Sequence, residues 1–265
     1  MLHNVNELRG FTIAASDGEI GKVKDVYFDD ERWAIRYLVV DTGGWLDERR
    51  VLISPRAVSA IGWSEKTIPV NLSRQQVRDS PGVDTDKPVS RQYETDYSDY
   101  YGYPSYWNGA DLWGLGVYPI PWVAGGAGSL GMVDPGDEGA ARELKARHER
   151  ELENADSHLR SSEEVTGYDI DATDGAIGEV DDLLFDEESW AIRYIVVDTR
   201  KWWPGKHVLV SPEWIDRVSW PEHSVFVNVT REAIKASPEY DRSHPLTRQE
   251  EEALYGHHSR PAYWR

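Results

Sequence analysis

Short apolar runs separated by turn residues recur along the first part of the chain, a pattern typical of β-strands. The stretch Trp33–Thr42 is rich in β-branched and aromatic residues and contains no glycine or proline, which predicts a central strand. Regular alternation along this strand would place Trp33, Ile35, Tyr37 and Val39 on one face and Ala34, Leu38 and Val40 on the other.

Turn signals divide the neighbouring sequence into further short strands. Asp17-Gly18 lies between Phe11–Ala15 and Ile20–Phe28 and predicts a tight hairpin, because these residues tolerate a positive φ. Val51–Ser54 and Thr67–Leu72 follow as strands, with a short helix or turn at Arg56–Val58. Ser73 then predicts an N-cap for the helical turn Arg74–Arg78, which is mirrored at Thr230–Lys235. Five or six short strands at this spacing predict a small, partly open β-barrel.

The same pattern returns 157 residues later in the chain. Gly10–Trp107 aligns with Gly167–Trp264 without a gap, and 41 of the 98 positions are identical. The matching blocks are Asp17–Asp25 with Asp174–Asp182, Trp33–Thr42 with Trp190–Thr199, and Val51–Pro55 with Val208–Pro212. The aromatic tail also repeats, since Pro88–Trp107 matches Pro245–Trp264. The sequence therefore predicts an all-β protein built from two copies of one module.

The insert Asn108–Thr166 shows no counterpart elsewhere in the sequence. Its first half, Leu112–Val133, is uncharged, but six glycines and two prolines favour a flexible apolar loop over a membrane helix. Its second half, Asp137–Arg160, predicts a helix that packs on a barrel or, alternatively, binds a partner. The apolar stripe of this helix is Ala141, Leu144, His148, Leu152, Ala155 and Leu159.

The predicted organisation has five parts. They are a first barrel at 1–84, its aromatic tail at 85–107, the Gly-rich and helical insert at 108–166, a second barrel at 167–241 and its tail at 242–265.

A resemblance to a known family rests on residues found in both copies. The series Asp17-Gly18, Gly21, Val23, Asp25, Phe28, Tyr37, Val39-Val40 and Pro55, repeated from Asp174 to Pro212, resembles the PRC-barrel family, named after the cytoplasmic domain of the photosynthetic reaction centre H subunit. The resemblance covers roughly 75 residues of each copy. It implies small, partly open barrels that act as binding modules in reaction-centre assembly and RNA processing factors, and it implies no catalytic residues.

Composition narrows the range of partners. A net charge of −18 disfavours nucleic acid and anionic membrane surfaces. The absence of cysteine excludes disulfides and cysteine-based metal or thiol chemistry. The opening sequence has no signal-peptide pattern, so we expect a cytoplasmic protein, with a peripheral position at the inner membrane as the alternative.

Candidate chemistry is sparse. The acidic clusters Asp25–Glu31 and Asp181–Glu188 contain ligands for hard cations, but strand alternation is expected to scatter them over solvent. Asp41 and Asp198 each end the central strand, where we expect a turn or cap rather than a general base. Arg36 and Arg193 should form structural ion pairs, because an isolated buried guanidinium is costly. His207, His223 and His244 are replaced in the first copy by Arg50, Lys66 and Lys87.

The residues that both copies share at turns, central strand and tail are the ones expected at structural motifs or interfaces. They are Asp17, Gly18, Gly21, Trp33, Tyr37, Asp41 and Trp107 in the first copy, and Asp174, Gly175, Gly178, Trp190, Tyr194, Asp198 and Trp264 in the second. We predict no catalytic residue, cofactor or metal site. Each tail should either pack on a barrel or serve as an aromatic recognition segment.

The combined pattern favours a non-enzymatic interaction or scaffold protein whose two barrels pair by pseudo-twofold symmetry and bind a further protein. One alternative is a membrane-associated, reaction-centre-H-like assembly factor or subunit of an electron-transfer complex. Another is a metal-dependent enzyme that uses the acidic clusters.

Overall fold

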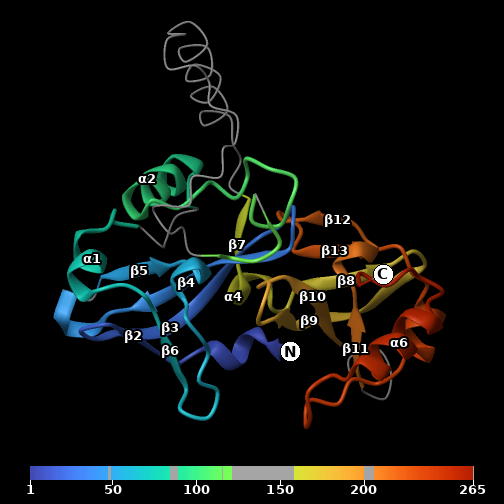
Figure 1. Cartoon of the computed structure of the whole chain (residues 1–265). Helices are drawn as coiled ribbons and strands as arrows, with labels where there is room; N and C mark the ends of the chain where they lie inside the picture. Colours follow the sequence, from blue (N-terminus) through green and yellow to red (C-terminus); the bar gives the residue numbers. More distant parts are fainter. Residues whose placement is uncertain (47–48, 84–88, 115, 121–157, 200–205, 265) are drawn as a thin grey trace, which may run out of the picture.

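The computed structural model describes residues 1–46, 49–83, 89–114, 116–120, 158–199 and 206–264, and each copy contributes one antiparallel-rich sheet (Figure 1). The first sheet has the order β5-β4-β3-β2-β6. Its strands are β2 (Thr12–Ala15), β3 (Gly18–Asp29), β4 (Ala34–Asp41), β5 (Arg50–Ile53) and β6 (Thr67–Pro69).

The second sheet repeats this arrangement in the order β11-β10-β9-β8-β13-β12. Its strands are β8 (Asp169–Ala172), β9 (Gly175–Asp186), β10 (Ile192–Asp198), β11 (His207–Val210), β12 (Ile215–Ser219) and β13 (Ser224–Val227). The equivalent of the β12–β13 pair in the first copy consists of β6 and two isolated bridges, Val58↔Val70 and Gly62↔Thr67.

Both copies also contain short helices. They are η1 (Val5–Leu8), η2 (Gly43–Leu46), η3 (Pro55–Ala57), α1 (Arg74–Asp79), α2 (Arg91–Tyr101), α4 (Ser162–Val165), η4 (Pro212–Trp214), α5 (Arg231–Ala236) and α6 (Arg248–His257). Ser73 caps α1 through a capping box with Gln76, as the sequence predicts. The tail helices α2 and α6 start at equivalent positions, each after a capping Ser or Thr.

The predicted mostly β architecture is correct, but the sheets do not close into barrels. Each sheet is extended by a parallel pairing, of β2 with β6 and of β8 with β13. The strand order of the first sheet ends at β5 and β6, and that of the second ends at β11 and β12. These four strands are therefore edge strands.

A β-bulge interrupts the regular alternation predicted for the central strand. Tyr37 pairs with Tyr27 and Ile35 pairs with Phe28, which leaves Arg36 as an extra residue. Ile35 therefore packs in the large core with Leu38 and not on the face of Tyr37. Arg193 is the corresponding extra residue between Ile192 and Tyr194 in the second copy.

The two copies exchange N-terminal arms across the centre of the molecule (Figure 1). β1 (Leu2–Asn4) pairs with β9 of the second copy, and β7 (Leu159–Ser161) pairs with β3 of the first. Each strand continues into a short helix, η1 or α4. Residues 159–165 are thus the counterpart of residues 2–8 and belong to the repeated fold, so the sequence-based end of the insert at Thr166 is too late.

The central strands also meet directly in a reciprocal backbone contact. The N–H of Ile35 donates to the carbonyl of Trp190 at 2.9 Å, and the N–H of Ile192 donates to the carbonyl of Trp33 at 2.7 Å. Trp33 and Trp190 are therefore turn residues with φ of 52° and 59°, not the first residues of the strands. Trp190 is 3% exposed, whereas Trp33 is only partly buried.

One hydrophobic core runs through both copies. It includes Leu8, Ile13 and Ile35 of the first copy and Ile170, Phe185 and Ile192 of the second. Burying an aliphatic side chain of this size stabilises by about 1.5–3 kcal/mol, so the shared core links the stability of the two sheets.

Most of the predicted apolar loop Leu112–Val133 and nearly all of the predicted helix Asp137–Arg160 lie outside the described residues. Of the loop, Trp113 is buried in the shared core. Within the ranges that the structure covers, no helix combines the length and apolar character needed to span a membrane.

Candidate functional site

The repeated Asp25 and Asp182 lie where the exchanged arms dock. Asp25 accepts hydrogen bonds from the hydroxyls of Ser161 and Ser162 at 2.6 and 2.9 Å and from the N–H of Glu163 at 3.2 Å. It thereby binds the first turn of α4 in the opposite arm. The predicted scatter of these carboxylates over solvent is wrong for Asp25, which is 7% exposed, because the arm covers it.

Asp182 holds the other arm with fewer hydrogen bonds. It accepts from the backbone N–H of Asn6 at 3.2 Å and of Leu183 at 2.8 Å. The positions of the two serine hydroxyls at Asp25 are taken here by Asn4 and Val5. Burial accordingly raises the pKa of Asp182 to about 6, and the backbone hydrogen bonds oppose this only in part.

A buried glutamate links the first tail to its own sheet. Glu94 on α2 accepts hydrogen bonds from the hydroxyls of Tyr106 and Tyr37 at 2.5 and 3.3 Å and forms an ion pair with Arg91 at 2.8 Å. Glu94 is 2% exposed, and burial raises its pKa to about 7 against the opposing effects of Arg91 and Tyr106. We call these four residues the first tail centre.

The second copy repeats this arrangement residue for residue. Glu251 on α6 accepts from Tyr194 and Tyr263, both at 2.8 Å, and forms an ion pair with Arg248 at 2.9 Å. Tyr255 of the same helix donates to Ser211, the N-cap of η4 in its own copy, at 3.3 Å. Each tail therefore packs on its own copy, through Tyr37 in the first and Tyr194 in the second. Of the two predicted roles of the tails, packing on the sheet is the one observed.

Arg36 and Arg193, the extra residues of the two β-bulges, lie against tyrosine rings of these centres. Arg36 is 1% exposed and forms an ion pair with Asp29 at 2.9 Å, as predicted. Its guanidinium lies 3.8 Å from the ring centre of Tyr106 and 4.8 Å from that of Trp113. Arg193 lies 3.9 Å from Asp186 and 4.2 Å from the ring centre of Tyr263.

Two equivalent grooves flank the seam between the copies. The first groove encloses about 480 Å³ and is lined by Val58 and Ile61 of the first copy, by Trp190 of the second, and by the insert residues Tyr118 and Ile120. The second groove encloses about 530 Å³, and the equivalent positions on its walls are Ile215, Val218 and Trp33. Both grooves are therefore lined by residues of both copies.

The grooves differ in charge at two equivalent positions at or beside their walls. Arg56 beside the first groove donates to the backbone carbonyls of Ile120 and Trp113 at 3.1 and 2.9 Å, and so holds part of the insert against the seam. The equivalent residue in the second groove is Glu213, and Ser59 is replaced by Asp216. Glu213 and Asp216 are both exposed.

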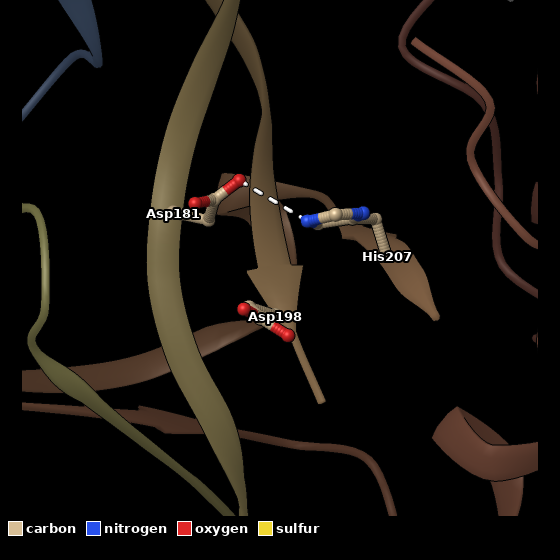
Figure 2. Close-up of side chains that lie close together, drawn as sticks. All are labelled: Asp181, Asp198 and His207. Carbon is tan, nitrogen blue, oxygen red and sulfur yellow. Dashed lines mark ion pairs between the residues drawn. The ribbon is translucent and has the colours of Figure 1, made fainter. Parts of the chain in front are cut away.

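A candidate metal-ligand group occurs in the second copy alone among the described residues. Ligand atoms of Asp181, Asp198 and His207 lie within 4.8 Å of one another, and Figure 2 shows the three side chains on neighbouring strands. Asp181 lies 3.3 Å from His207 and accepts a close hydrogen bond from Arg242. The guanidinium of Arg242 thus places next to Asp181 the positive charge that a bound cation would otherwise provide.

The remaining predicted residues have structural positions. Asp17 and Asp174 accept from the first backbone N–H of α1 and α5 at 2.7 Å, and Asp41 accepts from Gly43 in the following turn. Gly18 and Gly175 have positive φ at the hairpins. A Cβ on Gly21 or Gly178 would lie 2.0 or 2.2 Å from the carbonyl oxygen of Asp41 or Asp198. Trp107 and Trp264 stack under Arg91 and Arg248.

Sequence reasoning missed the two glutamates and the exchanged arms. A signal for the glutamates exists, because Arg91, Gln92 and Glu94 recur as Arg248, Gln249 and Glu251. The arms share only two of seven aligned residues, Leu2 with Leu159 and Glu7 with Glu164, so sequence identity does not reveal them.

Comparison with known proteins agrees with the duplicated architecture. The model of the PRC-barrel domain matches residues 2–71 and again residues 163–234, together more than half of the 265 residues. The second match includes residues 163–165 of α4 in the exchanged arm. No curated protein matches the chain. The chain therefore belongs to the PRC-barrel domain family and carries the domain twice.

Proposed function

We propose that the protein is a non-enzymatic scaffold that binds another protein at the seam between its two copies. The observation that supports this most strongly is the use of the repeated residues. Asp25 and its counterpart hold the arms, Glu94 and its counterpart hold the tails, and the bulged Arg36 pairs with Asp29. These repeated residues therefore have structural roles. The two seam grooves are the surfaces that the duplication creates for binding.

The composition of the grooves also favours protein binding. Their apolar walls of Val, Ile and Trp are bordered by charged residues, which is the usual character of protein interfaces. The first groove provides an internal example, since the chain's own Tyr118, Pro119 and Ile120 line it. We place this activity in the cytoplasm, and the net charge of −18 disfavours anionic membranes and nucleic acid as partners.

The proposal can be tested by affinity capture of the tagged full chain from its native host, with quantification of the co-purifying proteins. We expect a small set of partners at stoichiometric levels. A matched capture with the variant Trp33→Asp, which places a charge on the wall of the second groove, should lose them. Absence of any partner above the level of an untagged control would contradict the scaffold function.

A further inference from the structure

The second groove has exposed carboxylates without partners. Glu213 and Asp216 lie on one wall, and in the part of the chain that the structure covers no hydrogen bond or ion pair reaches either carboxylate. Two other acids of the groove differ from them, since Asp30 is paired with Arg160 at 2.7 Å and Glu31 with His158 at 3.5 Å.

The arginines near this groove do not neutralise those two carboxylates. Arg32 donates to the carbonyls of Tyr106, Gly109 and Asp111 at 2.5–2.8 Å. Arg193 lies over the ring of Tyr263, and Arg217 lies over the ring of Phe226 with its guanidinium 3.5 Å from the ring centre. The groove therefore presents free negative charge beside an apolar floor.

The equivalent first groove shows what kind of ligand this shape accommodates. There the chain's own Tyr118-Pro119-Ile120 lies along the wall, and Arg56 holds it by donating to the carbonyl of Ile120. At the second groove the replacement of Arg56 by Glu213 removes a donor for backbone carbonyls and supplies an acceptor for cations. The two grooves thus share apolar wall positions and differ in charge at this position.

We propose that the second groove binds a short segment of another protein in which lysine or arginine alternates with aromatic or aliphatic residues. Apolar side chains of that segment would contact Trp33, Ile215, Val218 and Trp220, while its cations pair with Glu213 and Asp216. A second copy of this chain is a poor occupant, because both molecules carry a net charge of −18. This proposal rests on the scaffold function and names the chemistry of its partner.

The test uses the purified full chain and three labelled hexapeptides in fluorescence anisotropy. The probe is Lys-Trp-Lys-Ile-Lys-Trp, and its controls replace every lysine by glutamate or every apolar residue by serine. We expect the probe to bind and both control peptides to bind at least about tenfold more weakly, a factor equivalent to about 1.4 kcal/mol.

The matched variants separate the groove from overall charge. Glu213→Arg/Asp216→Ser installs the residues of the first groove, which this fold already accepts, and should weaken probe binding at least tenfold. Glu232→Arg/Glu239→Ser makes the same charge change at exposed positions on and after α5 and should leave binding unchanged. Circular dichroism of each variant verifies the fold.

Several outcomes would overturn the proposal. These are no binding of the probe up to about 1 mM, equal loss in both double variants, or equal binding of the glutamate peptide. Concentration-dependent self-association that Glu213→Arg/Asp216→Ser abolishes would assign the groove to a second copy instead. Partner capture from the host that persists in this double variant would retain the scaffold function but contradict this groove as its site.

Discussion

Replacing Glu94 by Gln should flatten the dependence of stability on pH. Glu94 is 2% exposed, and burial raises its pKa from 4.5 to about 7. The folded protein therefore binds a proton at this carboxyl more readily than the unfolded chain does. The resulting stabilisation is fully present below pH 4.5 and is lost as the pH rises towards 7. The Gln variant keeps the size of the side chain but cannot titrate.

The magnitude follows from the difference of about 2.5 pKa units, each equivalent to about 1.36 kcal/mol. Because only part of this range lies between pH 8 and pH 5, the wild-type protein should gain about 2–3 kcal/mol from Glu94 on acidification across that interval. Asp182, with a pKa raised to about 6, changes stability in the same direction in both proteins and so cancels in the comparison.

Urea unfolding followed by tryptophan fluorescence at pH 5, 6, 7 and 8 measures this difference directly. We expect the free energy of unfolding to depend less steeply on pH in Glu94→Gln than in the wild type. Glu252→Gln, at an exposed position on α6, is the matched control and should follow the wild type. Identical pH dependence in wild type and Glu94→Gln would refute the assignment of Glu94 as a buried, titrating carboxyl.

Three further predictions concern packing and charge. Gly21→Ala should destabilise by about 1–3 kcal/mol in denaturant melts, because its Cβ would lie 2.0 Å from the carbonyl oxygen of Asp41; an unchanged midpoint would show that the backbone relaxes freely. Removing residues 254–265 should lower the melting temperature and increase binding of a hydrophobic dye, since Tyr263 donates to the buried Glu251; a melt like that of the full chain would indicate a tail that adds no stability. Zinc should raise the melting temperature of Arg242→Ala but not of wild type or Arg217→Ala, because Arg242 occupies Asp181; an equal shift in all three proteins would contradict this role of Arg242.

The internal repeat made much of the fold predictable from sequence. The hairpin at Asp17-Gly18 and the short helices after Ser54 and Ser73 follow from local turn and capping chemistry, and the structure contains them. The central strand is also present at Ala34–Asp41. These elements depend on neighbouring residues, which the sequence displays directly.

The features missed from sequence depend on contacts between distant segments. The bulge at Arg36 has no local signal, and it places the buried guanidinium against Asp29 and Tyr106. The arm strand at residues 2–4 is recognisable only through its partner, β9, some 180 residues away. The difference between the two grooves likewise becomes meaningful only when Glu213 and Arg56 are known to occupy equivalent positions.

The exchange of arms is the basis of the paired architecture, and hydrogen exchange measured by mass spectrometry tests it most directly. The comparison is between the full chain and a variant lacking residues 1–8, which removes β1 and η1. Because β1 pairs with Leu184–Asp186, the largest loss of protection should fall in β9 of the second copy. A loss confined to the first sheet, with unchanged exchange in β9, would contradict the exchange of arms.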